Sequence, residues 1–183
     1  IRDSLGWVWA ADRGTTSRIR AVSAQPGGQE RIVTATWLRP GERIVDLRLA
    51  RSGARAAMLV DDGQRTTLRV SGVVRGSDGV PNALTEPILL PSSGSEDSVE
   101  WAGDTNLLVS AYAAKPDERV VPRIVSVDGT VRELNPLGGL RGISAGDDGA
   151  YYAETEEFVF LLVGSSWRAQ ELDRGVRDLS FPD

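Results

Sequence analysis

The sequence predicts an all-β protein, a β-propeller built from four-stranded antiparallel blades. Short runs of branched and aromatic residues place apolar side chains at every second position, which is typical of strands. Asp-Gly, Ser-Gly and Pro-Gly pairs separate the runs, and these are the preferred compositions of tight hairpins. The runs come in sets of four that follow one another along the chain. Gly and Pro interrupt every window long enough for a helix.

The clearest set spans residues 44–90. In its third strand Leu68 and Val70 alternate with Arg69 and Ser71. Its four strands are predicted at residues 44–50, 55–60, 67–73 and 84–90. A single sheet of this kind cannot bury both of its faces alone, so it requires neighbours of the same type.

Similar strands are predicted before and after this set. Three precede it, at residues 6–12, 18–22 and 31–37. Two sets of four follow it, at residues 98–101, 106–113, 120–127 and 130–134, and at residues 140–145, 150–154, 157–163 and 167–172. A lone strand is predicted at residues 176–183. The first strands begin near residues 44, 98, 141 and 176, at spacings comparable to the roughly 40 to 50 residues of known propeller blades. A β-sandwich is the alternative architecture.

The two ends of the chain predict how the ring closes. The opening segment supplies three strands and the closing segment supplies one. When the C-terminal residues are written directly before the N-terminal residues, the joined sequence resembles the internal junction at residues 44–57. We therefore expect the C-terminal strand to complete the first blade, with Leu179 beside the strand at Trp7 to Trp9, because such pairing protects the edges of a propeller. About four blades result; the alternative is that they form part of a larger propeller.

We expect residues 1–183 to be one propeller domain and a fragment of a longer protein. The chain opens at Ile1 without Met or a signal peptide. Its longest apolar run, residues 158–163, has the length of a strand and not the roughly 20 residues of a transmembrane helix.

Charge and composition exclude several functions. The formal net charge is −5, which argues against nucleic acid as a partner, because phosphate binding needs a clustered basic surface. The chain has no Cys, so neither disulfides nor thiol chemistry operate. It also has no His, which removes the commonest general base and the commonest zinc ligand. No catalytic residue, metal or cofactor is predicted.

Carboxylates are the remaining candidates for acid–base chemistry. Asp46, Glu100, Asp104 and Asp178 lie on or just after predicted innermost strands, which line the central channel of a propeller. Paired carboxylates there could hydrolyse glycosides. The alternative is that Asp104 is a turn residue and that the others are solvated or paired with arginines. The candidate partner-binding residues of the channel are Asp46, Arg48, Glu100, Arg141, Arg177 and Asp178.

Two clusters of aspartate permit a calcium interpretation. They are Asp61-Asp62-Gly63 and Asp147-Asp148-Gly149. The complete ligand pattern of a calcium loop is missing, and Asp-Gly is also the preferred composition of a tight hairpin, which is the interpretation we favour.

The five tryptophans and the two longest polar loops have two interpretations each. The tryptophans could stack on carbohydrate, or pack between blades, which we favour. The loops at residues 75–82 and 115–119 could recognise a partner, since recognition often resides on loops of a rigid scaffold. Either loop could equally be a connection without a partner.

Several strings in this order resemble the C-terminal propeller of the LpqB family of bacterial lipoproteins. They are GWVWAAD at residues 6–12, VVRGSDG at 73–79, ALTEP at 83–87, VEWAGDT at 99–105 and LSFP at 179–182. The resemblance implies a lipoprotein anchored to the outer face of the plasma membrane in actinobacteria, with a lipidated cysteine and a GerMN-like domain upstream. It also implies a protein partner, the extracellular region of an MtrB-like sensor histidine kinase in a two-component system. No catalytic motif comes with the family.

Three functional hypotheses follow. The first is a non-enzymatic, extracytoplasmic protein-interaction domain of an LpqB-like lipoprotein that regulates cell-envelope processes. The second is a propeller that binds or cleaves cell-envelope glycans, which requires exposed tryptophans around a pocket. The third is a structural spacer that positions other domains.

Overall fold

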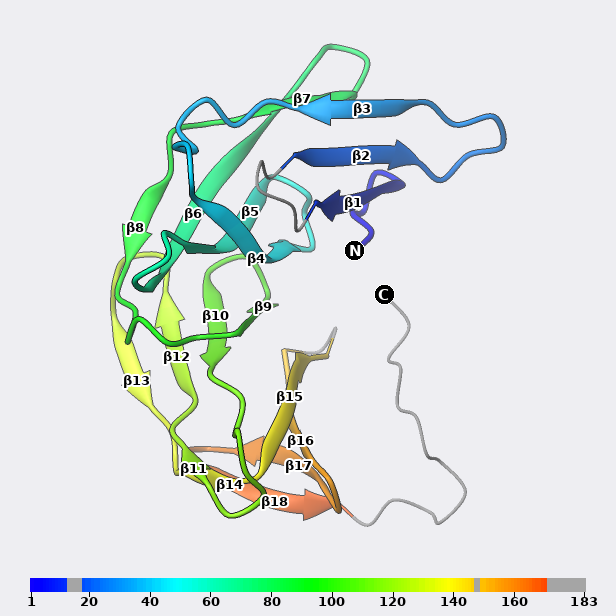
Figure 1. Cartoon of the computed structure of the whole chain (residues 1–183). Helices are drawn as coiled ribbons and strands as arrows, with labels where there is room; N and C mark the ends of the chain where they lie inside the picture. Colours follow the sequence, from blue (N-terminus) through cyan, green and yellow to red (C-terminus); the bar gives the residue numbers. More distant parts are fainter. Residues whose placement is uncertain (13–17, 147–148, 171–183) are drawn as a thin grey trace.

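Four antiparallel sheets of three to five strands follow one another along an arc, and a fifth sheet has only two strands (Figure 1). The structure is a computed structural model, and it describes residues 1–12, 18–146 and 149–170. Within these residues there is no helix, and therefore none that could cross a membrane. The predicted all-β propeller fold is confirmed.

Each of the four larger sheets is a blade, and we number the blades in chain order. Blade 1 contains β1 (Trp7–Ala11), β2 (Ile19–Ser23) and β3 (Glu30–Val33). Blade 2 contains β4 (Arg43–Leu49), β5 (Arg55–Asp61), β6 (Thr66–Arg75) and β8 (Ile88–Leu90), with β7 (Pro81–Leu84) also paired to β6. Blade 3 contains β9 (Ser98–Ala102), β10 (Asn106–Ser110), β12 (Arg123–Ser126) and β13 (Val131–Glu133). Blade 4 contains β15 (Leu140–Ala145), β16 (Tyr151–Thr155), β17 (Val159–Val163) and β18 (Ser166–Gln170). A two-stranded ladder joins β11 (Arg119–Val120) to β14 (Leu137–Gly138).

The middle blades bury both of their faces, as β5 shows most clearly. Successive side chains of a strand point to opposite faces of its sheet. Met58 and Val60 accordingly belong to the apolar cluster between blades 1 and 2. Ala57 and Leu59 belong to the cluster between blades 2 and 3. All four side chains are fully buried, so this strand reads as a continuous apolar run with little alternation.

Three apolar clusters join the four blades. The first lies between blades 1 and 2 and includes Trp9 and Met58. The second lies between blades 2 and 3 and includes Leu59 and Leu107. The third lies between blades 3 and 4 and includes Leu108. Each blade thus stabilises the next by removing apolar area from water.

Two predicted strands are each divided in two. The strand expected at residues 84–90 is β7 followed by β8, and both pair with the ten-residue β6. Pro87 lies between them, where its missing N–H removes a ladder bond. The strand expected at residues 120–127 is β11 followed by β12, and Pro122 separates them. The proline residues therefore set these boundaries, which the apolar pattern alone did not indicate.

The first three residues occupy the edge of β1 that β2 leaves open. Arg2 forms a β-bridge with Val8. The Trp9 N–H donates to the Ile1 carbonyl, and the terminal amino group of Ile1 donates to the Trp9 carbonyl. The predicted closing strand at residues 176–183, including Leu179, lies outside the described residues.

Truncation inside a blade–blade cluster should destabilise the whole arc. We expect Leu59→Ala to lower the free energy of unfolding by about 2 to 5 kcal/mol, because the buried site cannot fully collapse. Leu89→Ala, at a residue of β8 that is 69% exposed, is the matched control and should change the free energy of unfolding by less than about 0.5 kcal/mol. Urea unfolding measures both, and equal effects would contradict this account of the core.

Candidate functional site

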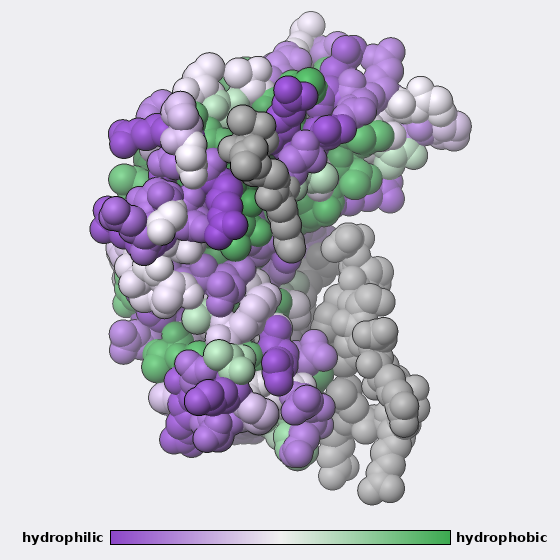
Figure 2. Space-filling view, viewed as in Figure 1, coloured by the Kyte–Doolittle hydropathy of each residue, from purple (hydrophilic) through white to green (hydrophobic). Residues whose placement is uncertain are grey.

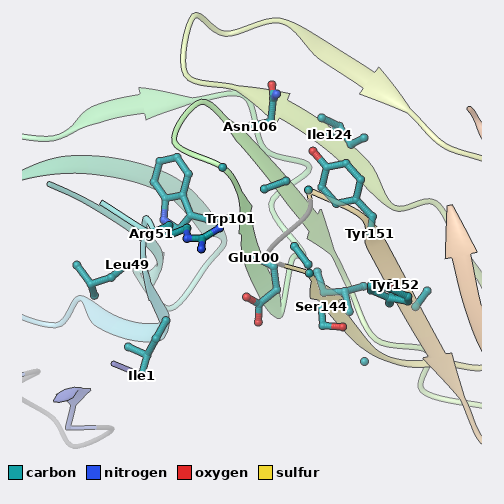
Figure 3. A pocket seen from close by; sticks show the side chains of 18 of the residues that line it. Ile1, Leu49, Arg51, Glu100, Trp101, Asn106, Ile124, Ser144, Tyr151 and Tyr152 are labelled. Atoms are coloured by element: carbon teal, nitrogen blue, oxygen red, sulfur yellow. The ribbon is translucent and has the colours of Figure 1, made fainter. Parts of the chain in front are cut away.

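The inner side of the arc is hollowed into a cavity of about 1330 Å³, which we call the central cleft. Ile1 and Arg51 line it from blades 1 and 2. Glu100 and Trp101 line it from β9, and Tyr151 from β16 (Figure 3). The cleft therefore includes the position of a propeller's channel, and it also extends outward between blades 3 and 4 as far as Ile124 and Arg132.

Three of the six predicted partner-binding residues lie together beside this cleft. The Arg48 guanidinium on β4 lies 2.9 Å from the Asp46 carboxylate and 2.7 Å from the Glu100 carboxylate on β9. The second oxygen of Asp46 accepts a hydrogen bond from the Val99 N–H at 3.0 Å. We call Asp46, Arg48 and Glu100 the Arg48 cluster. It joins the innermost strands of blades 2 and 3, and Glu100 also faces the cleft.

Arg48 is partly buried, and its two carboxylate partners offset the effect of burial on its charge. Burial acts to lower the pKa of Arg48, but the negative charges of Glu100 and Asp46 outweigh it, and the pKa is raised. Burial also raises the pKa of the neighbouring Tyr112, against the effect of its hydrogen bond with Ser98. The arginine is therefore permanently charged, and the tyrosine is a neutral hydroxyl at physiological pH.

The other predicted partner-binding residues are not brought to this cluster. Arg141 is on β15, where its guanidinium lies 3.9 Å from the Glu156 carboxylate in an exposed, loose pair. Such exposed pairs contribute little to stability. Arg177 and Asp178 lie outside the described residues.

Asp104 is a turn residue, as the alternative interpretation predicted. It follows β9, and its carboxylate accepts hydrogen bonds from the Ser52 hydroxyl at 2.9 Å and the Ser52 N–H at 3.3 Å. Its carbonyl accepts a hydrogen bond from the Arg55 guanidinium. Asp104 therefore fastens a turn of blade 3 to a turn of blade 2.

The first aspartate cluster forms a hairpin turn. Asp61 accepts a hydrogen bond from the Gly63 N–H, and Asp62 accepts two, from Gln64 and Arg65. The Gly63 N–H and the Arg43 guanidinium together hold the pKa of Asp61 below its usual range. Among the described residues no three acidic side chains are grouped as a metal site would need. Asp147 and Asp148 of the second cluster lie outside the described residues.

Tryptophan indoles pack between blades and bond across them. Trp9 is 2% exposed. The Trp101 indole of blade 3 donates to the Arg48 carbonyl of blade 2 at 3.1 Å. The Trp167 indole of blade 4 donates to the Asn135 carbonyl at 3.0 Å. The favoured interpretation, packing between blades, describes these three, and Trp101 in addition lines the central cleft.

Buried pairs of a carboxylate and an arginine were not predicted. The three pairs are Asp3 with Arg75, Glu42 with Arg69, and Glu96 with Arg123. In blade 2 the Arg69 guanidinium binds both oxygens of Glu42, at 2.7 and 3.0 Å, and lies 5.6 Å from the Trp37 ring centroid. Two parallel bonds to one carboxylate fix the geometry as well as the charge.

The sequence carried a signal for two of these pairs. Glu42 and Glu96 each stand just before the first strand of a blade, at the end of a four-residue turn. Glu42 accepts a bond from the Arg39 N–H, and Glu96 accepts bonds from Ser93 and Gly94. The Pro-Gly-Glu and Ser-Gly-Ser-Glu strings mark these turns, but the arginine partners are on the third strands, distant in sequence.

Asp3 is the most deeply enclosed of these carboxylates. Its side chain is fully buried, and it accepts bonds from the Trp7 N–H, the Trp9 indole at 2.9 Å and the Arg75 guanidinium at 2.5 Å. Burial acts to raise the pKa of Asp3, but these hydrogen bonds and the charge of Arg75 outweigh it and lower the pKa. Asp3 therefore ties the first residues of blade 1 to blade 2 as a charged group.

The loop at residues 75–82 of blade 2 is bonded at both of its ends to the part of the chain around blade 1, and we call it the clamp. Arg75 at its base binds Asp3, and its guanidinium also donates to the Gly79 carbonyl at 3.0 Å. At its other end the Asn82 carbonyl accepts a bond from the Thr34 N–H of blade 1 at 3.0 Å. This loop has a structural role that neither interpretation from the sequence included.

The loop at residues 115–119 is likewise fastened to its surroundings. The Glu118 carboxylate accepts a bond from the Ala114 N–H at 2.7 Å, and its carbonyl accepts one from Gly139. Gly139 has φ of +65°, and a Cβ there would lie 2.7 Å from the Pro116 carbonyl oxygen, so the close approach requires glycine.

The blades, the clusters between them and the channel-side cleft define a β-propeller domain. Solved structures support that class by shape alone. A prolyl endopeptidase structure covers 94% of this chain with a TM-score of 0.56 and 18% identity, and the match spans 28% of that chain. A putative 6-phosphogluconolactonase from Bacteroides uniformis covers 90% with a TM-score of 0.55 and 12% identity, and the match spans 50% of that chain.

Comparison of sequences then gives the family. The model described as the lipoprotein LpqB β-propeller domain matches residues 1–182. Lipoprotein LpqB of Streptomyces avermitilis is 27% identical over 177 residues, which cover 91% of this chain and 28% of that protein. The chain belongs to the LpqB β-propeller domain family, and it spans little more than a quarter of this relative's length. The predicted resemblance is confirmed.

Removal of the Asp3 charge should weaken the attachment of blade 1. We expect Asp3→Asn to lower the free energy of unfolding at pH 7 by about 3 to 5 kcal/mol, because Arg75 loses its buried partner. Because the folded-state pKa lies below the ordinary value of 3.8, the stabilisation is fully present above that value and is lost as the pH falls through the folded-state pKa.

The measurement is urea unfolding of both proteins between pH 7 and pH 2. The difference between wild type and Asp3→Asn should shrink as the pH falls below about 4. Glu86→Gln, an exposed carboxylate, is the control and should unfold like wild type. A difference that stays constant down to pH 2 would contradict the assignment of a charged Asp3.

Proposed function

We propose that this chain is a non-enzymatic interaction domain of an LpqB-like lipoprotein, which binds a partner protein through the central cleft. Membership of the LpqB propeller family supports the class of protein. The name of the Streptomyces relative supports attachment to a membrane outside the cytoplasm, through a lipid anchor that is not part of these residues.

The observation that carries the proposal is the pairing of the carboxylates on the innermost strands. Asp46 and Glu100 both bind Arg48, and Asp46 binds two backbone N–H groups as well. A glycosidase needs two carboxyl groups whose pKa values are pushed apart and which face the scissile bond. Two carboxylates that share one arginine are arranged to hold two blades together and to present a fixed polar surface.

The dimensions of the cleft favour a polypeptide as the occupant. Pockets for small molecules usually enclose about 300 to 1,000 Å³, and the central cleft has about 1330 Å³. Its walls combine Trp101, Tyr151 and Tyr152 with the exposed Arg51. Aromatic side chains and arginine are the residue types that most often dominate binding between proteins.

The partner that the family resemblance implies is the extracellular region of an MtrB-like sensor histidine kinase. On this proposal the domain acts at the outer face of the plasma membrane and modulates a two-component system that controls cell-envelope processes. Regulation then follows from occupancy of the cleft, without chemistry on the partner.

The test is direct binding of the extracellular region of that kinase to the immobilised domain. We expect Arg51→Glu and Tyr152→Ala each to weaken binding by about tenfold or more, as for residues central to an interface. Arg31→Glu, an exposed reversal of charge on β3 that does not line the cleft, is the matched control and should bind like wild type. Absence of binding by the wild-type domain would refute the partner assignment.

The aromatic residues of the cleft favour one alternative, a propeller that binds cell-envelope glycans. Sugar rings stack on exposed aromatic faces, and Tyr151 and Tyr152 are both partly exposed in the cleft. A screen against cell-wall glycans separates the two functions. Glycan binding that Tyr152→Ala abolishes, with no affinity for the kinase region, would replace the proposed function by this one.

A further inference from the structure

We propose that the outer face of blade 1 is a blade–blade interface, covered in the complete protein by a further propeller blade. By the outer face we mean the side of β1, β2 and β3 that points away from blade 2. Its members are Val8, Ala10, Arg20, Val22, Glu30 and Ile32.

The strand register places these residues on one face. Val8 is opposite Val22, and Val22 is opposite Glu30. Two positions along each strand, Arg20 is opposite both Ala10 and Ile32. Cross-strand partners share a face, and so do residues two apart on one strand. The four apolar members therefore form one surface that crosses all three strands.

The two faces of blade 1 differ sharply in exposure. Trp9, Ile19 and Ala21, which point to blade 2, are at most 2% exposed. Val22 is 40% exposed, and Ile32 is 61% exposed. Figure 2 shows apolar surface over this part of the molecule. The middle blades have no such asymmetry, since β5 buries the side chains of both its faces.

Closure of the ring supplies the second argument. A closed propeller needs as many blade–blade interfaces as it has blades, because each blade is covered on both sides. In the described part of the chain four blades are joined by three apolar clusters, and none joins blade 4 to blade 1. Figure 1 shows the two end blades apart, and the central cleft, lined by Ile1 and Tyr152, extends between them. The outer face of blade 1 therefore lies where the next interface of a ring would be.

The occupant that these observations favour is another blade and not a second copy of this chain. The side of blade 1 that faces blade 2 is already covered by a sheet. A further sheet on the outer face would repeat the same packing of one sheet on another. The match to the putative lactonase leaves half of that chain unmatched, and the match to the Streptomyces relative leaves most of that protein unmatched. Both proteins thus have ample polypeptide for further blades.

The charged residues of this face fit burial at the edge of an interface. Arg20 lies 3.1 Å from the Asp12 carboxylate and 3.0 Å from the Glu30 carboxylate. Two carboxylates thus share one arginine beside the apolar residues Val8 and Val22, and the group carries one negative charge in excess. All three charged side chains are 41 to 50% exposed, so a covering sheet can pack on the apolar side chains while these charges stay in contact with water at the edge of the interface.

Cysteine labelling of the complete lipoprotein tests the proposal, because residues 1–183 contain no cysteine of their own. The variants are Val22→Cys and Ile32→Cys, with any cysteine outside these residues replaced by serine. Leu89→Cys, at an exposed position of β8, is the matched control. The readout is the rate of reaction with a maleimide, and labelling in urea calibrates the intrinsic reactivity of each thiol.

We expect the cysteines at positions 22 and 32 to react at least about tenfold more slowly than the cysteine at position 89 in the folded monomer, since they become accessible only when the interface opens. Equal rates at all three positions in a folded monomer would overturn the proposal. Protection that appears only at concentrations where the protein dimerises would also overturn it, because a second copy would then be the occupant.

Discussion

The structure depends on one constraint, that a sheet with apolar side chains on both faces needs a neighbour on each side. In β5 alternate residues of a single strand enter two different clusters, so Met58 contributes to one interface while Leu59 contributes to the next. No blade has a core of its own. Stability is consequently shared between neighbours, and truncation of one strand affects two interfaces, as in other repeat proteins.

Buried polar groups add specificity to this apolar packing. The carboxylates of Asp3, Glu42 and Glu96 are each enclosed with an arginine, and each also accepts backbone hydrogen bonds. Such pairs contribute little net stability compared with an apolar core, but the loss of one partner is strongly unfavourable. Displacement of a turn or of the N-terminal segment from its blade would leave a buried charge without its partner and is therefore strongly unfavourable. The Arg48 cluster has the same construction and in addition borders the cleft through Glu100.

Much of the fold could be predicted from period-two patterns and turn residues, because both are local. The strand expected at residues 140–145 agrees with β15. The boundaries at Pro87 and Pro122 were missed because the apolar pattern continues across them. The members of the Arg48 cluster could be predicted from the sequence, because propeller geometry brings the first strands of neighbouring blades together. The Asp3–Arg75 pair was not, since the two residues are 72 positions apart and only packing joins them. The clamp formed by residues 75–82 was missed for the same reason.

The central claim, that the cleft is where a partner protein binds, is tested most directly by hydrogen–deuterium exchange of the domain with and without the kinase extracellular region. The account predicts slower exchange in the complex at the backbone amides around Arg51, Trp101 and Tyr152, with β3 and β8, which contribute no residue to the cleft, unchanged. Protection confined to β3 and β8, with the amides around the cleft unaffected, would contradict it.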